Sequence, residues 1–200
     1  ILKKLFHSFS NKGGAFQKDE IHSVENINEK ILYKEIEYDG LVVCTGAFSK
    51  KLVKQIEGKF IPLETERGYH IEFPGSSILL NRPTCLVESG MYLTPLNGRI
   101  RAAGTVELDD LSLKISKDRI NYLFKEARRI LPALKDYKNP WLGFSPTLPD
   151  CLPIISPSPK FRNIYYAFGH NHLGWTLGPT TGKMINGLIS RNIDINKAFS

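Results

Sequence analysis

Two strand-like runs, residues 91–96 and 99–106, are joined by the dipeptide Asn97-Gly98. Asn-Gly supplies the two positive-φ positions that a tight β-hairpin requires, which makes it the strongest local indicator of structure in this chain. Because a hairpin pairs neighbouring strands antiparallel, this part of the chain is expected to build an antiparallel sheet.

Further runs at 68–73 and 77–80 are also typical of strands, so the meander is expected to occupy 61–113. A helix is expected over 116–131, opened by a Ser116 cap and packed on the sheet. Its apolar residues fall on one stripe: Ile120, Leu123, Phe124, Ala127, Ile130 and Leu131.

A different pattern precedes and follows the meander. Residues 41–44 are apolar without alternation, as in a strand covered on both faces, and Ser49 is placed to cap a helix over about 50–57. Residues 163–168 predict another buried strand, and a closing helix is expected to end at about Arg191. Strands alternating with helices in this way are typical of α/β folds.

The other segments are less regular. Residues 2–9 have helical spacing and stop at Gly13-Gly14, and strands are expected over 15–24 and 30–38. Six of the twelve prolines lie between 140 and 159, which predicts a stiff, irregular connection.

Composition limits the class of protein. With 42% hydrophobic and 24% charged residues, the 200-residue chain is expected to be globular. Its net charge of +7 is spread evenly, which does not favour nucleic-acid binding. Without a long apolar run, no membrane span is expected. The chain begins with Ile1, and we expect that this is not a natural start.

Three widely spaced cysteines, Cys44, Cys85 and Cys151, do not form a disulfide pattern. They are expected to be small buried hydrophobes in a reducing compartment. We therefore predict a cytoplasmic protein, with peripheral attachment to the inner membrane as an open alternative.

The turn at 169–174 joins a predicted strand to a helix, an arrangement that directs backbone N–H groups at an anion or a polar cofactor edge. The same glycines also have a purely geometric explanation. His170 and His172 form an H-x-H pair, but no cysteine or carboxylate lies nearby at ligand spacing, so no metal site is predicted.

Residues 64–70 combine two acids, an arginine, a tyrosine and a histidine at the start of a strand. The guanidinium of Arg67 could grip a carboxylate or a phosphate. The alternative is that Glu66 and Arg67 form an exposed ion pair of little energetic weight.

Five segments in order carry a resemblance that none of them carries alone. They are residues 38–49, 62–70, 103–107, 141–153 and 166–174. Together they resemble the C-terminal half of FAD-dependent oxidoreductases of the D-amino-acid oxidase superfamily, in particular the small subunits of D-amino-acid dehydrogenases. The similarity runs from about Gly13 to Ile195.

The resemblance implies a mixed α/β (α+β) fold, in which an antiparallel β-sheet substrate domain is inserted into a partial glutathione-reductase-like FAD-binding domain. Residues 1–61 and 160–200 would belong to the FAD domain and 62–159 to the substrate domain. The cofactor would contact Thr45, Gly46, Gly169, His170, His172, Leu173, Gly174 and Thr176. The last helix would point its N-terminus, with about half a positive charge, at the flavin's pyrimidine edge.

The implied reaction removes a hydride from the α-carbon of an amine or D-amino acid, giving an imine that water converts to a keto acid and ammonia. Oxygen and a quinone both stay open as the electron acceptor. The family's G-x-G-x-x-G, which seats the FAD pyrophosphate, precedes the segments present here.

The chain departs from the family at one position that bears on the substrate. The family motif reads Gly-Phe-Arg-Pro, and its arginine commonly pairs with the substrate carboxylate; here the residue is Ser145. Arg67 and His172 are candidate replacements, and Tyr69 is a further candidate substrate contact. A truncated or degenerate relative that binds a ligand or partner without turnover is the alternative.

Overall fold

The computed structural model describes residues 1–112 and 114–190. A small sheet contains three strands in the order β10-β11-β4. Their bounds are Leu41–Val43 for β4, Ile154–Pro157 for β10 and Ile164–Phe168 for β11. β11 and β4 run parallel, whereas β10 and β11 run antiparallel. The two predicted buried strands are therefore neighbours in space.

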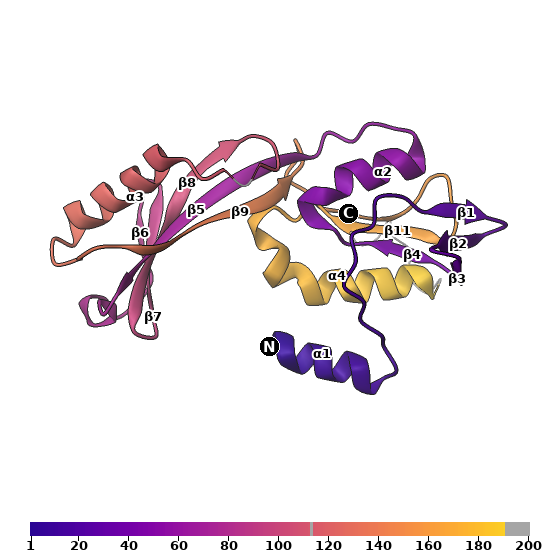
Figure 1. Ribbon diagram of the computed structural model, residues 1–200, viewed down its shortest axis with the longest axis horizontal. Coiled ribbons are helices and arrows are strands. Elements are labelled where there is room, and N and C mark those ends of the chain that lie inside the picture. Colours follow the sequence, from indigo (N-terminus) through magenta and orange to yellow (C-terminus); the bar gives the residue numbers. More distant parts are fainter. Residues whose placement is uncertain (113, 191–200) are drawn as a thin grey trace.

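Two helices cover the opposite faces of the small sheet (Figure 1). α2 (Ser49–Glu57) packs its Leu52, Val53 and Ile56 on the face that carries Val43. α4 (Gly174–Ile189) packs Ile185 on the other face. The apolar β4 run thus lies between two layers, as its lack of alternation predicts.

The larger sheet has five antiparallel strands in the order β6-β7-β8-β5-β9. The strands are β5 (Glu64–Pro74), β6 (Thr84–Leu86), β7 (Met91–Leu96), β8 (Arg99–Leu108) and β9 (Lys138–Thr147). This sheet confirms the expectation of an antiparallel β structure.

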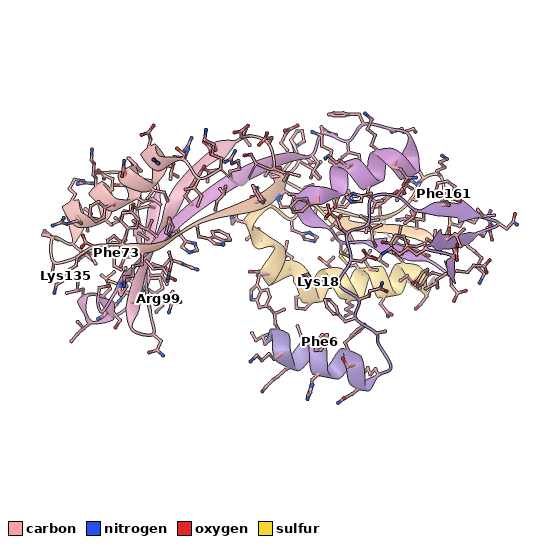
Figure 2. All side chains as sticks on the ribbon, viewed as in Figure 1. Phe6, Lys18, Phe73, Arg99, Lys135 and Phe161 are labelled. Carbon is pink, nitrogen blue, oxygen red and sulfur yellow. The ribbon has the colours of Figure 1, made fainter. Side chains whose placement is uncertain are left out.

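α3 (Lys117–Ile130) covers one face of the larger sheet, and no helix in the described chain covers the other (Figure 1). The Oγ of Ser116 accepts a hydrogen bond from the backbone N–H of Arg119, which confirms the predicted cap. Figure 2 shows Phe73 near α3 and Arg99 on the opposite side of the sheet. The core beneath α3 contains Ile71, Leu93, Ile100, Leu123 and Ala127.

The remaining elements are short. They are α1 (Leu2–Asn11), β1 (Glu25–Ile27), β2 (Lys30–Tyr33), β3 (Ile36–Tyr38) and the 3-10 turns η1 (Gly46–Phe48), η2 (Ser77–Leu79) and η3 (Asn171–Leu173). α1 ends before Gly13, as predicted, and buries none of its residues.

The predicted hairpin is confirmed, because Leu96 pairs with Arg99 across a two-residue loop. Its expected backbone geometry is wrong at one position: Gly98 has a φ of 72°, but Asn97 is not in the positive-φ region. Paired positive φ values occur instead at Asn28 and Glu29, between β1 and β2, and at Lys34 and Glu35, between β2 and β3.

Three strand predictions were wrong. Residues 15–24 form no strand, because no strand of the described chain pairs with them. The run 30–38 is split into two antiparallel strands by the turn at Lys34 and Glu35. Residues 77–80 contain a 3-10 turn rather than a strand.

The proline-rich stretch is more regular than expected. Residues 138–147 form β9 and residues 154–157 form β10, so the prediction of an irregular connection over 140–159 was wrong for most of its length. Both strands lie at sheet edges, where proline is tolerated because part of the backbone N–H groups face away from the neighbouring strand.

Other local expectations also need correction. Cys44, Cys85 and Cys151 are exposed rather than buried. Ser49 is the first residue of α2 and makes no capping bond; its Oγ lies 2.9 Å from Thr45 Oγ1. Among the described residues, no helix is long and apolar enough to cross a bilayer. The predicted helix end at Arg191 lies outside the described residues.

Candidate functional site

A cavity of about 450 Å³ opens at the carboxyl ends of the parallel strands β4 and β11. Its volume lies within the range of about 300–1000 Å³ that is common for small-molecule sites. In open α/β sheets, ligands bind outside the carboxyl ends of the strands. The lining residues are Val42, Cys44, Gly46, Pro146, Ala167, Phe168, His170, Asn171, Gly174, Gly178, Thr181, Gly182 and Ile185.

The loop between β11 and α4 is shaped by two residues with positive φ. Gly169 has a φ of 84°, which favours glycine, and a Cβ there would lie 2.9 Å from Leu148 Cδ1. Asn171 has a φ of 54°, and its Nδ2 donates to Thr147 Oγ1 at the end of β9. The loop is therefore held against the larger sheet as well as the small one.

His170 connects this loop to α4. Its Nε2 lies 2.8 Å from Thr181 Oγ1, two turns along the helix. Burial lowers the pKa of His170 below its usual value, so its neutral form is favoured. A neutral imidazole has one donor and one acceptor nitrogen, so Nδ1 keeps one hydrogen-bonding function.

No side chain caps the N-terminus of α4, and the 3-10 turn η3 leads directly into it. Leu173 occupies the cap position without a side-chain bond, and the first turn contains no acidic residue. The first backbone N–H groups of a helix have no partner within the helix and carry part of its positive charge. These groups can therefore bind an anionic or carbonyl edge of a ligand.

Glycines leave room for a flat ligand along one side of α4. Gly174, Gly178 and Gly182 are spaced four residues apart and line the cavity. A Cβ at Gly178 or Gly182, or at Gly46 across the cavity, would meet no atom within 4 Å. The residues present thus fit a planar cofactor that approaches the backbone on this side.

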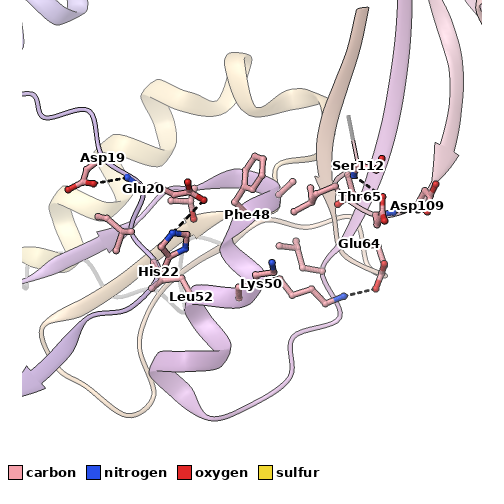
Figure 3. A pocket seen from close by; sticks show the side chains of 17 residues that line it. Asp19, Glu20, His22, Phe48, Lys50, Leu52, Glu64, Thr65, Asp109 and Ser112 are labelled. Carbon is pink, nitrogen blue, oxygen red and sulfur yellow. Dashed lines mark hydrogen bonds and ion pairs between the residues drawn. The ribbon is translucent and has the colours of Figure 1, made fainter. Parts of the chain in front are cut away.

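The structure brings together three of the predicted cofactor residues. Gly46, His170 and Gly174 line the same cavity, although Gly46 and Gly174 are far apart in sequence. Thr45 points elsewhere: it lines a second cavity, of about 1180 Å³, between α2 and the segments 19–22 and 109–112 (Figure 3).

The second cavity is less suited to a phosphate-bearing cofactor. Five carboxylates and two lysines line it, so its charge is mostly negative. Figure 3 shows one of the ion pairs, in which Lys50 Nζ donates to Glu64 Oε1 at 3.0 Å. We therefore take the smaller cavity as the candidate site.

The other predicted cofactor residues lie around the same loop but not in its cavity. Gly169 shapes the turn, and Thr176 is exposed in the first turn of α4. His172 is exposed, with Nδ1 2.9 Å from Asn171 Oδ1, and Leu173 is 45% exposed. His170 and His172 belong to no cluster of three metal-ligand side chains in the described chain.

Two of the predicted substrate residues face away from the open side of the larger sheet. Arg67 is 4% exposed and donates to Asp109 Oδ2 at 2.7 Å and to the Lys114 carbonyl at 2.6 Å. Tyr69 is buried under α3 and donates to Glu107; burial, followed by that contact, raises the pKa of its hydroxyl. Their positions do not favour contact with a substrate.

The sequence left open that Arg67 forms an exposed ion pair with Glu66. The structure does not have this pair. Arg67 Nε lies 3.4 Å from Glu107 Oε1, an ion pair that lacks hydrogen-bond geometry. The guanidinium is enclosed by its own acidic partners and has a structural role.

Ser145 does lie beside the candidate site. It pairs with Glu66 in the register of β9 and β5, and its neighbour Pro146 lines the cavity. Because side chains alternate along a strand, Ser145 faces the side of the sheet opposite to Pro146, and it supplies no cation.

Several lining residues were not predicted from the sequence, including Cys44, Asn171 and Thr181. A signal was present for the α4 face, since glycines four residues apart fall on one side of a helix. Asn171 also follows Gly169 closely, and asparagine tolerates positive φ.

Comparison with known proteins identifies the family. The family model described as "DAO: FAD dependent oxidoreductase" matches residues 1–188. A curated D-amino-acid oxidase of Bradyrhizobium diazoefficiens is 36% identical over 169 residues, covering 78% of this chain and 38% of that protein.

Solved structures agree at the level of the fold. Glycine oxidase from Bacillus cereus has a TM-score of 0.80 at 20% identity, over 96% of this chain and 56% of its own. L-α-glycerophosphate oxidase from Mycoplasma pneumoniae, solved with FAD bound, has a TM-score of 0.74 at 16% identity, over 86% of this chain and 50% of its own.

The chain spans less than half the length of the curated relatives that it matches. The match nevertheless extends from the first residue through most of α4, and it includes both segments that meet at the candidate site. The chain belongs to the DAO family of FAD-dependent oxidoreductases.

Proposed function

We propose that this chain forms part of an FAD-dependent oxidoreductase that oxidises an amine or a D-amino acid. The proposal rests on one cavity that is lined by Gly46, His170 and Gly174. This cavity lies at the N-terminus of α4, which no side chain caps. The curated relatives named D-amino-acid oxidase and D-amino acid dehydrogenase support the substrate class.

In this proposal, the small sheet with α2 and α4 is part of a glutathione-reductase-like FAD domain. The five-stranded sheet with α3 is the inserted substrate domain. The predicted division assigned residues 1–61 and 160–200 to the first and 62–159 to the second. Because β10 pairs with β11, we place the return to the FAD domain before Ile154.

The chain's own residues would bind and orient the cofactor. Gly46, Gly178 and Gly182 present backbone without a side chain, so a flat ring can approach. The N–H groups at the start of α4 favour negative charge on the bound group. When bound, FAD supplies the acceptor for a hydride.

His170 would serve as a neutral polar contact rather than as a charged group. Its Nε2 is occupied by Thr181, which fixes the ring orientation and leaves Nδ1 available. A proton on both nitrogens would add positive charge at a site where burial disfavours charge.

The proposed reaction has a simple balance. The neutral substrate amine loses a hydride from its α-carbon and a proton from its nitrogen, which forms an imine. Water then converts the imine to a keto acid, or to a carbonyl compound if the substrate has no carboxylate, and releases ammonia. Oxygen or a quinone would regenerate the oxidised cofactor.

The test begins with the full-length gene product. It is expected to purify with bound flavin and to oxidise D-amino acids faster than the L-enantiomers. Gly182→Leu is expected to abolish flavin binding by filling the cavity, because leucine is at least as favourable as glycine in a helix. Lys183→Leu, at an exposed position of the same helix, is the matched control.

A colourless protein that ignores added FAD would contradict the proposal. The second candidate is a degenerate relative that binds a ligand without turnover, and Ser145 is the observation that favours it. Flavin bound tightly, with no reduction by any D-amino acid or amine, would support this second candidate.

A further inference from the structure

The loop before α4 holds a second histidine in a fixed orientation. His172 lies in η3, and its imidazole is exposed. Its Nδ1 lies 2.9 Å from Asn171 Oδ1, and its backbone N–H donates to the same oxygen at 2.8 Å. At the other end of the Asn171 amide, Nδ2 donates to Thr147 Oγ1 at 3.2 Å. These bonds identify which end of the amide is the oxygen.

The amide oxygen determines the tautomer of His172. Such an oxygen only accepts hydrogen bonds, so Nδ1 carries the proton in its bond to Asn171. In the neutral ring, Nε2 is then the nitrogen with the free lone pair. No residue in the described part of the chain bonds to this Nε2. A neighbouring group that orients the imidazole, with the second nitrogen left open, is the arrangement that a general base requires.

His172 borders the open side of the candidate site. Asn171, which orients its ring, lines the cavity, and so does Gly174 two positions further along the chain. η3 also contacts β9, so the loop lies where the larger sheet approaches the small sheet (Figure 1). A cofactor would fill the inside of the cavity, and a substrate would have to reach it from the exposed side. His172 is placed to meet that substrate.

The ionisable groups inside the cavity are poorly suited to accept a proton. Among the lining residues, these groups are Cys44 and His170. Burial raises the pKa of the Cys44 thiol, so the thiol stays neutral. His170 Nε2 is already bonded to Thr181, and burial lowers the pKa of His170, which disfavours its protonated form. His172 has neither restriction, because its Nε2 is open and its ring is exposed.

The proposed reaction needs such a base. Amino groups carry an extra proton near neutral pH, and a hydride can leave the α-carbon only when the nitrogen lone pair is free to form the C=N bond. We propose that Nε2 of His172 accepts the proton of the substrate ammonium group, with Asn171 as the positioning residue. The inference rests on the proposed function and names the catalytic base of that site.

The step balances in protons and electrons. One N–H bond of the ammonium group breaks, its electron pair stays on the nitrogen, and the proton bonds to Nε2. Because His172 is exposed, the ring then passes this proton to water. A hydride leaves the α-carbon for the cofactor with two electrons, and the nitrogen pair forms the C=N bond. Nδ1 keeps its proton and its bond to Asn171 throughout.

The first test measures binding without turnover. The probes are 2-methylalanine and tert-butylamine, which have no α-hydrogen and cannot be oxidised in this way. Binding to the full-length, flavin-loaded protein is measured by calorimetry at about pH 8, in buffers that differ in ionisation enthalpy. We expect the wild type to release about one proton per probe bound, and His172→Gln to release almost none. His7→Gln, at an exposed position of α1, is the matched control and should behave as the wild type.

The second test compares two substrates. His172→Gln is expected to lower kcat/KM for D-alanine about a hundredfold. Trifluoro-D-alanine has a much less basic amine that is already neutral at about pH 8, so its kcat/KM should fall less than about threefold. Imidazole in solution should restore about tenfold of the rate that His172→Ala loses with D-alanine. Asn171→Gly keeps the positive φ but removes the orienting oxygen, and it should cost about tenfold.

The outcomes separate the base from the proposed function. A wild type that binds neither probe, or that binds one without releasing a proton, overturns the assignment of His172. Equal losses for the two substrates in His172→Gln, or no loss for D-alanine, overturn it as well and leave the proposed function intact. Proton release that depends on His172, in a protein that oxidises no amine, supports the assignment and counts against the proposed function.

Discussion

Arg67 and Arg101 lie on neighbouring strands of one sheet but point to opposite faces. Side chains alternate along a strand, so Arg67 shares its side of β5 with Tyr69, Ile71 and Phe73, which all pack beneath α3. The alternation was available in the sequence. What the sequence could not supply was the ion pair with Asp109, 42 positions away.

Replacement of Arg67 should therefore affect stability rather than ligand affinity. Arg67→Met is expected to lower the free energy of unfolding by about 1–3 kcal/mol, because the Lys114 carbonyl loses a charged donor. Urea denaturation measures the change, and Lys125→Met, an equal charge change at an exposed position of α3, is the control. If Arg67→Met lowers the free energy of unfolding by less than about 0.5 kcal/mol and also weakens the binding of benzoate, a carboxylate probe, Arg67 is again a candidate substrate residue.

His170 gives a prediction about pH. Because burial lowers its folded-state pKa below the ordinary value of about 6.5, the folded protein favours the neutral ring more than the unfolded chain does. The stability contribution of His170 is complete above that ordinary value and is lost as the pH falls through the folded pKa. An NMR titration should place the His170 midpoint below 6.5; a midpoint at or above it contradicts the prediction.

At the scale of elements, the helices and the central hairpin were predictable and the edge strands were not. The 116–131 stripe places Ile120, Leu123 and Ala127 in the core, as expected. β9 was missed because Pro140 and Pro146 argue against a strand, and only a strand's position in a sheet reveals that an edge tolerates them. Residues 15–24 were assigned to a strand because the sequence pattern does not show whether a pairing partner exists.

The packing of α3 can be tested with one substitution. Leu123 is fully buried beneath the helix, so Leu123→Ala is expected to lower the free energy of unfolding by about 2–5 kcal/mol. Lys125→Ala, on the exposed side of α3, should change it by less than about 0.5 kcal/mol. Equal effects of the two substitutions in urea denaturation would contradict the observed packing.

At the scale of the molecule, several large apolar side chains of the described chain are mostly exposed, although Phe6 meets Phe16 edge to face. Leu2, Leu5, Phe6 and Phe9 of α1 are each 49% exposed or more, and Trp175 of α4 is 63% exposed. Patches of this kind normally lie at interfaces or promote association. Since the family relatives are more than twice as long as this chain, we expect other parts of the protein to cover these residues.

Residues 1–200 expressed alone should therefore bind a hydrophobic dye and self-associate, whereas the full-length protein should do neither. Phe6→Glu is expected to reduce the association of the isolated segment, and His7→Glu, an exposed polar neighbour, serves as its control. Light scattering and dye fluorescence measure both effects. A monomeric segment without dye binding would show that α1 has another arrangement.

The parallel pairing of β4 with β11 also determines the order in which the protein can fold. Strands β5 to β8 pair over at most 42 positions, the separation of Glu66 and Leu108. β4, in contrast, must wait for a strand synthesised after the whole larger sheet, and Tyr166 reaches Glu57 across 109 positions. Closing so long a loop costs chain entropy before any contact compensates for it. The cofactor-facing half should therefore consolidate last, and ligand present during refolding should accelerate recovery more than ligand added afterwards.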